Sequence, residues 1–142
     1  TEAAIAGTAL QRYEISNYAL PGHRCRHNLC YWTRGEYLGM GLAAHSFLGG
    51  ERFANTSDFD AYLSGIRRVS GDFIGPREAF EEEVMLGTRL SEGIARERLK
   101  GREGIARVLA EAGLATVEAG RFALTQRGMD VQNAVVLKLL DP

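Results

Sequence analysis

The stretch from Leu114 to Leu124 reads Leu-Ala-Thr-Val-Glu-Ala-Gly-Arg-Phe-Ala-Leu, and it decides the fold of the second half of the chain. Two runs of strand-forming residues flank Ala119-Gly120, which predicts a β-hairpin. Helices are predicted on both sides, from Arg102 to Ala112 and from Thr125, as N-cap, to Leu140. A further helix is predicted from Pro76 to about Leu90. The order helix, helix, hairpin, helix predicts a small winged-helix-like α+β module.

The first half of the chain is richer in aromatic residues and carries weaker signals. The run Tyr37-Leu38-Gly39-Met40-Gly41-Leu42-Ala43-Ala44 is apolar and uncharged, which predicts a strand buried on both faces. Other expected elements are a helix from Glu2 to Gln11, a strand from Arg12 to Ser16, a loop from Asn17 to Arg26, and a helix from Asp58 to Ile66 capped by Ser57. Glycine and proline at residues 71–76 predict a boundary between two domains, 1–75 and 76–142.

Composition and charge exclude several classes of protein. The chain has 142 residues, of which 45% are apolar and 25% charged, as in ordinary globular domains. A formal charge of −1 argues against nucleic acid as a partner, and without an apolar run of about 20 residues any membrane association would be peripheral. Two cysteines make no disulfide framework and favour a cytoplasmic location. Because the chain begins at Thr1 without Met, we expect either a processed chain or a piece of a longer protein.

Four residues with soft-metal donor atoms, His23, Cys25, His27 and Cys30, fall within eight positions. Zinc needs four such donors in a tetrahedron, but this spacing is not that of a usual zinc finger. The favoured interpretation is a loop in which most of these side chains are incidental. A Cys30–His45 nucleophilic pair stays open only if the fold brings the two together.

Two further patterns are weak. Gly39 to Ala44 fits G-x-G-x-x-A, but the glycines lie inside the apolar run instead of following it, so a dinucleotide site is not favoured. The basic residues between positions 93 and 107 could contact phosphate, but a solvated helix face is the preferred interpretation.

Several motifs, taken together, resemble one known family. They are Tyr13-Glu14-Ile15-Ser16-Asn17-Tyr18-Ala19, His27-Asn28-Leu29-Cys30-Tyr31-Trp32, Tyr37-Leu38-Gly39-Met40-Gly41, Ala44-His45-Ser46, Arg52 and Asn55. This order resembles the C-terminal part of the oxygen-independent coproporphyrinogen III oxidase-like radical SAM family, in particular its heme chaperone branch. The second half, from Glu81 through Gly128, resembles the C-terminal domain of that family.

The resemblance implies an α/β fold, with the last strands and helices of a partial (β/α) radical SAM barrel in residues 1–75 and the winged-helix-like domain in residues 76–142. In this family a 4Fe–4S cluster that binds S-adenosylmethionine is held by a three-cysteine motif in the N-terminal part. That motif is absent here, so the chain would need the missing N-terminal half as its partner. Alone, we expect it to be catalytically inactive, and we assign no catalytic residue.

The resemblance also implies the site residues. His27, Asn28, Tyr31 and Trp32 would contact heme, with His27 as the ligand of the heme iron, because imidazole is a common axial ligand and flat aromatic rings suit a porphyrin. Leu29, Cys30, Ala44 and His45 would line the S-adenosylmethionine pocket. The plainer interpretation is that His27 and Asn28 only hold down a loop.

The expected function is that of a heme chaperone-like protein, which binds heme and transfers it to an acceptor protein. The alternative is the oxidase reaction, the oxidative decarboxylation of coproporphyrinogen III by a radical derived from S-adenosylmethionine. Because an isolated end of a barrel exposes strand edges, we also expect self-association through residues 1–75.

Overall fold

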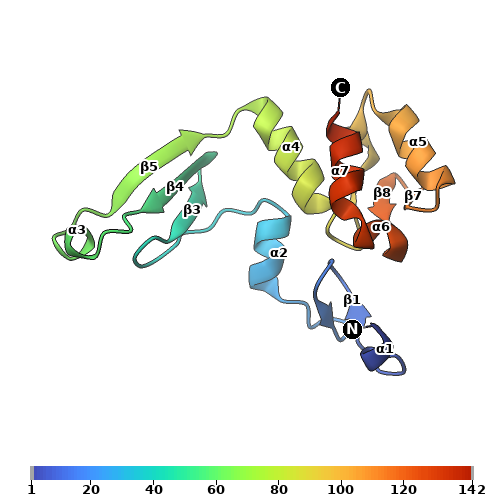
Figure 1. Ribbon diagram of the computed structural model, residues 1–142, viewed down its shortest axis with the longest axis horizontal. Helices are drawn as coiled ribbons and strands as arrows, with labels where there is room; N and C mark the ends of the chain where they lie inside the picture. Colours follow the sequence, from blue (N-terminus) through green and yellow to red (C-terminus); the bar gives the residue numbers. More distant parts are fainter. Residues whose placement is uncertain (1, 142) are drawn as a thin grey trace.

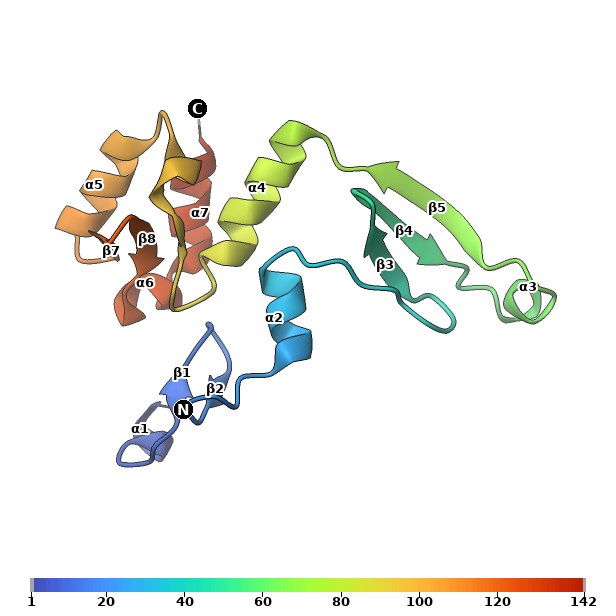
Figure 2. The ribbon, with the colours of Figure 1, turned by 180° about the vertical axis from the view of Figure 1, so that it is seen from behind.

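The computed structural model describes residues 2–141, and its elements form three groups (Figure 1; seen from behind in Figure 2). The N-terminal group consists of α1 (Glu2–Ile5), β1 (Gln11–Arg12), β2 (Tyr18–Ala19) and α2 (Arg26–Trp32). The middle group consists of β3 (His45–Leu48), β4 (Glu51–Asn55), α3 (Phe59–Leu63) and β5 (Arg68–Phe73). The C-terminal group consists of α4 (Pro76–Gly87), β6 (Ile94–Ala95), the 3-10 helix η1 (Arg96–Leu99), α5 (Glu103–Glu111), β7 (Ala115–Glu118), β8 (Arg121–Leu124), α6 (Gln126–Asp130) and α7 (Gln132–Leu140).

The main hydrophobic core lies in the C-terminal group. Its antiparallel sheet has the order β6-β8-β7, and helices α4, α5 and α7 lie around it (Figure 1). Phe122 on β8 and Leu139 on α7 are both 0% exposed. The predicted hairpin is confirmed, and its turn places Ala119 and Gly120 at φ angles of 49° and 74°. This left-handed turn returns β8 beside β7 and so closes the core.

The predicted helices of this half are confirmed, with changed ends. Helix α4 begins at Pro76 as predicted but ends at Gly87. The final helix is divided into α6 and α7, because Val131 has a φ of −120° and leaves the helical region. Thr125 is the N-cap of α6, as predicted, since its side chain accepts a hydrogen bond from the amide of Gly128.

The middle group is an antiparallel sheet of order β3-β4-β5 that extends away from the C-terminal core (Figures 1 and 2). The predicted strand over residues 37–44 is wrong. Gly41 and Ala43 have φ angles of 106° and 56°, which no β-strand accommodates. The run is therefore a loop, apart from a single bridge between Tyr37 and Phe47, and the strand begins only at His45.

The prediction for the first 25 residues is also corrected. Helix α1 ends at Ile5 rather than Gln11, and Gly7, with a φ of 86°, follows it in the left-handed region. The strand predicted over residues 12–16 is only the short β1, and β2 lies inside the predicted loop. Helix α2, which follows that loop, was not predicted.

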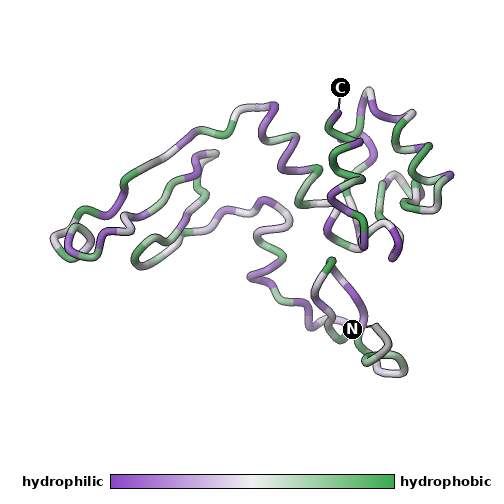
Figure 3. The backbone as a smooth tube through the Cα atoms, in the orientation of Figure 1, coloured by the Kyte–Doolittle hydropathy of each residue, from purple (hydrophilic) through white to green (hydrophobic). Residues whose placement is uncertain are grey.

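Helix α3 is shorter than the predicted helix of residues 58–66, and its N-cap is Asp58 rather than Ser57. Apolar side chains of the middle group are exposed, notably Phe59, Leu63 and Phe73, the last to 77%. Figure 3 shows hydrophobic segments in this outlying part as well as in the C-terminal core. Self-association of residues 1–75 stays a prediction that such a surface favours. Within residues 2–141, no helix is both long and apolar enough to cross a membrane.

Candidate functional site

Helix α2 carries six of the eight predicted site residues, and two of them form a pair. His27 and Tyr31 are four positions apart and therefore share one face of the helix. The Tyr31 hydroxyl lies 3.1 Å from Nε2 of His27, and the two rings meet edge-on with centroids 4.9 Å apart. The Tyr37 ring contacts Tyr31 at 4.6 Å. The result is a partly exposed row of three aromatic rings, which we call the α2 aromatic row.

Tyr37 is held in this row from outside the helix. Its amide and carbonyl are both hydrogen-bonded to the backbone of Phe47, each at 2.9 Å. The loop after α2 is thereby attached to β3, and the row is supported by the middle sheet as well as by the helix.

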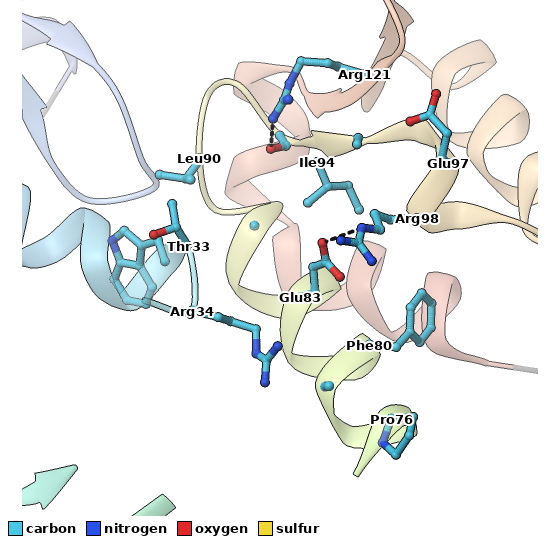
Figure 4. Close-up of a pocket in the computed structure, with 15 residues that line it drawn as sticks. Thr33, Arg34, Pro76, Phe80, Glu83, Leu90, Ile94, Glu97, Arg98 and Arg121 are labelled. Carbon is cyan, nitrogen blue, oxygen red and sulfur yellow. Dashed lines mark hydrogen bonds and ion pairs between the residues drawn. The ribbon is translucent and has the colours of Figure 1, made fainter. Parts of the chain in front are cut away.

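Trp32 does not belong to this row. Its ring lies beneath the guanidinium of Arg89, whose Cζ is 4.2 Å from the ring centroid. Trp32 also lines a cavity of about 730 Å³ between the end of α2, α4 and β6. Figure 4 shows this cavity with Leu90, Ile94 and the Glu83–Arg98 ion pair around it. The predicted heme residues thus divide between two places, and Asn28 is a half-buried residue of α2.

The four residues predicted for the S-adenosylmethionine pocket are also divided. Leu29 lines a cavity of about 450 Å³. The Cys30 thiol lies 3.4 Å from the carbonyl oxygen of Glu36. His45, the first residue of β3, lines a different cavity of about 610 Å³, and the preceding Ala44 is half-buried.

The other candidate sites receive no support from the geometry. Among residues 2–141, no group of three or more His, Cys, Asp or Glu side chains gathers closely enough to hold a metal ion, so His23, Cys25, His27 and Cys30 do not form a zinc site. In the basic stretch, Arg98 pairs with Glu83 at 3.0 Å, and Arg102 bonds to the carbonyl of Leu139. Part of this positive charge is therefore engaged in contacts within the chain.

The sequence does not indicate an ion-pair cluster that lies over Phe47, the residue whose backbone bonds to Tyr37. The Glu82 carboxylate of α4, with a side chain only 13% exposed, binds Arg34 at 2.9 Å and also binds Arg52 of β4. Both guanidinium groups lie over the Phe47 ring, at 5.4 and 5.3 Å. This cluster joins the loop after α2, the middle sheet and α4. Arg52 belongs to the motif pattern, but the sequence alone does not indicate its partner.

The ion pairs set the protonation of Glu82. Burial by itself would raise the pKa of Glu82, but hydrogen bonds and charge attraction from Arg52 and Arg34 outweigh burial, and the pKa lies below its ordinary value near 4.5. The same contact with Glu82 raises the pKa of Arg52. Glu82 is therefore a carboxylate at neutral pH.

We expect Glu82→Gln to lower the free energy of unfolding at pH 7 by about 2 kcal/mol, because it removes charge-assisted hydrogen bonds to two guanidinium groups. Since the folded-state pKa of Glu82 is lowered, its contribution is complete above the unfolded-state pKa and is lost as the pH falls through the folded-state pKa. Urea unfolding at pH 7 and at pH 3 measures both effects. The gap between wild type and Glu82→Gln should narrow at pH 3.

Glu81→Gln is the matched control on the same helix. Glu81 pairs with Arg77, whose side chain is 91% exposed, and solvent screens such a pair. We expect little change at either pH. An equal loss in the two variants would show that the buried position of Glu82 gives it no special role.

Comparisons with known proteins agree with this architecture. No family model matches the chain. Its fold matches coproporphyrinogen III oxidase (HemN) of Escherichia coli, a radical SAM enzyme, over 99% of this chain and 39% of that one, with a TM-score of 0.70 and 13% sequence identity. At that identity the likeness concerns the fold alone, a mixed α/β fold.

Curated sequences narrow the relationship. Heme chaperone HemW of Mycobacterium tuberculosis strain H37Rv is 36% identical over 146 residues, covering 98% of this chain and 37% of the relative. HemW of Bacillus subtilis strain 168 is 31% identical over 140 residues, covering 89% and 37%. The chain thus resembles the C-terminal part of the coproporphyrinogen III oxidase-like radical SAM family. Within that family it is a relative of the heme chaperones named HemW, and it spans about 37% of their length.

Proposed function

We propose that this chain is the heme-contacting C-terminal part of a radical SAM heme chaperone, which binds heme and passes it to an acceptor protein. The observation that carries the proposal is the α2 aromatic row, with an exposed imidazole and two partly exposed phenol rings. Imidazole is a good axial ligand for heme iron, and flat rings with polar edges suit a porphyrin. The donor set on this face therefore fits heme.

In this proposal each residue has a limited task. His27 supplies the nitrogen for the iron, and Tyr31, whose hydroxyl contacts Nε2 of His27, orients the imidazole in the ligand-free chain. Tyr37 supports Tyr31 from the β3 side. Asn28 would add a polar contact beside His27, whereas Trp32, packed under Arg89 and away from the α2 aromatic row, would support the helix. Only the iron and the propionates of the heme would interact with polar groups of the site. The heme itself would not be chemically changed, because a chaperone transports the group intact.

The test is a heme titration of the intact protein, followed by the Soret band. We expect His27→Ala to weaken binding on the order of tenfold or more and to change the band, because the iron loses a ligand. Tyr31→Phe should still bind heme, since it keeps the imidazole and frees its nitrogen. His23→Ala, at an exposed histidine before α2, is the control and should bind as wild type does. An unchanged band and affinity in His27→Ala would remove His27 as the ligand.

The rest of the radical SAM machinery is assigned by the same proposal. Residues 1–75 would be the end of the barrel, with Leu29, Cys30, Ala44 and His45 facing S-adenosylmethionine once the N-terminal half and its 4Fe–4S cluster are present. Residues 76–142 would be a winged-helix-like domain, which the order α4, β6, η1, α5, β7, β8 and the sheet order β6-β8-β7 support. A cytoplasmic location, with at most peripheral membrane contact, belongs to this proposal too.

The alternative is oxidative decarboxylation of coproporphyrinogen III, the substrate named for HemN, whose fold this chain shares. It is tested with the intact protein after cluster reconstitution, by assaying the loss of propionate carboxyl groups. Absence of product, together with heme binding that depends on His27, would decide for the chaperone.

A further inference from the structure

Arg89 lies where three segments that are distant in sequence meet. It follows α4, immediately before the turn that leads to β6. Its Nη2 donates to Oε2 of Glu14 at 3.2 Å, and its Cζ lies 4.2 Å from the centroid of the Trp32 ring. Glu14 comes from the N-terminal segment, and Trp32 is the last residue of α2. One guanidinium therefore connects both segments to the C-terminal domain.

Glu14 is fully buried and its carboxylate is fixed from two sides. Its side chain is 0% exposed. Oε1 accepts hydrogen bonds from the amide of Ser16 and from Nδ2 of Asn17, both at 2.7 Å, while Oε2 accepts from Arg89. The carboxylate therefore has little freedom to turn, and the plane of the guanidinium that it binds is held with it.

The backbone holds the same segments together. The amide of Ser91 donates to the carbonyl of Tyr13 at 3.0 Å, and Glu14 forms an isolated antiparallel bridge with Leu90. The N-terminal segment is thus also joined by its backbone to the two residues that follow Arg89. Movement of Glu14 would move Arg89 with it.

The Trp32 ring depends on this contact. The indole Nε1 and the Nε of Arg89 are both buried, and neither has a hydrogen-bond acceptor among the described residues. Hydrogen bonds from these two nitrogens therefore do not fix the pair. The ring is oriented instead by its packing and by the cation above its face.

We propose that Glu14 and Arg89 are positioning residues: Glu14 holds Arg89, Arg89 holds the Trp32 ring, and the ring sets how α2 presents its ligand-binding side chains. This rests on the proposed function in its last step only, since the hold on Trp32 can be measured without heme. It also gives a physical reason for the presence of the Tyr13–Asn17 and His27–Trp32 motifs in one chain, because they meet through Arg89.

The test uses the intact protein labelled with 5-fluorotryptophan, with the Trp32 resonance assigned by its loss in Trp32→Phe. Glu14→Gln keeps the volume and, with its oxygen as acceptor for Ser16 and Asn17, turns an amide donor toward Arg89. We expect it to shift or broaden the Trp32 resonance without heme. Arg89→Met should do the same from the other side of the contact, and Arg89→Lys, which keeps the cation, should have a smaller effect.

Heme affinity is the second readout. We expect Glu14→Gln and Arg89→Met each to weaken heme binding by about 5- to 10-fold, with Arg89→Lys between them and wild type. Glu92→Gln is the control, because Glu92 lies beside the same turn but forms its ion pair with Arg24, whereas Arg89 pairs with Glu14. It should leave both readouts unchanged.

The outcomes separate the two proposals. A Trp32 resonance that is unchanged in both variants would overturn the hold on Trp32. Glu14→Gln leaves only the partly exposed Arg89 without its partner, so it should fold even if Arg89→Met, which strands a buried carboxylate, does not. A shifted resonance with wild-type heme affinity would overturn the link from the ring to the ligand. If wild-type protein binds no heme, the proposed function fails, while the resonance still decides whether Glu14 and Arg89 position the ring.

Discussion

Phe122→Ala is expected to lower the free energy of unfolding by about 3–5 kcal/mol, because Phe122 is the largest fully buried side chain among the described residues. Phe122 is 0% exposed and lies on β8, the central strand of the C-terminal sheet. It belongs to the core cluster that includes Val84 of α4, Leu109 of α5 and Leu139 of α7. Because sheet and helices surround it, they cannot close the space that the ring leaves.

Urea unfolding followed by far-ultraviolet circular dichroism measures this loss. Leu137→Ala is the control, since Leu137 lies on α7 but is 71% exposed, and its truncation should change stability by no more than about 0.5 kcal/mol. Similar losses in the two variants would mean that the C-terminal group has no single core around β8. The truncation should leave the α2 aromatic row in place, because no residue of that row belongs to the core cluster.

The C-terminal half could be predicted from sequence because its elements carry local signals. The apolar stripe of α5, Pro76 at the start of α4 and Thr125 as a cap are each visible within a few residues. The hairpin needs only its turn residues and two short runs. The sequence does not predict the short strand β6, the 3-10 helix η1 or the break at Val131, and the break depends on a backbone angle that the apolar pattern does not reveal.

The first half could not be predicted in the same way, because its elements depend on partners. Helix α2 begins at Arg26, its N-cap Cys25 makes no side-chain capping hydrogen bond, and its first turn has no acidic residue, so nothing in the sequence marks its start. The strands β4 and β5 pair across α3, and every residue of β4 is half-buried, which leaves no alternation of apolar and polar residues. The composition of the glycine-rich run predicts a strand, because it gives no sign of the left-handed angles at Gly41 and Ala43.

In the candidate site, too, contacts that are local in sequence could be predicted and contacts between distant residues could not. The spacing of His27 and Tyr31 is visible in the sequence, but it brings the two rings together only if the segment is helical. Glu82 lies 48 positions from Arg34 and 30 from Arg52, so their contact requires the packing of α4 against the loop and sheet. The same holds for Glu14 and Arg89, which are 75 positions apart.

Gly93→Ala is expected to lower the free energy of unfolding by about 2–5 kcal/mol, although it adds only one methyl group. Gly93 precedes β6 with a φ of 60°, a conformation that strains alanine. An added Cβ would also collide with the carbonyl of Phe122 and with Cα of Ala123, both in the backbone of β8. That backbone cannot retreat, because β8 pairs with β6 on one side and β7 on the other.

Gly104→Ala is the matched control and should act in the opposite direction. Gly104 lies in α5, and an added Cβ would meet no atom within 4 Å. The exchange should stabilise the chain by about 0.5–1 kcal/mol, because alanine favours the helix over the unfolded chain. Urea unfolding of both variants gives the two signs. A Gly93→Ala protein as stable as wild type would mean that β6 does not pair closely with β8. Gly93 and Ile94 would then not line the cavity beside Trp32.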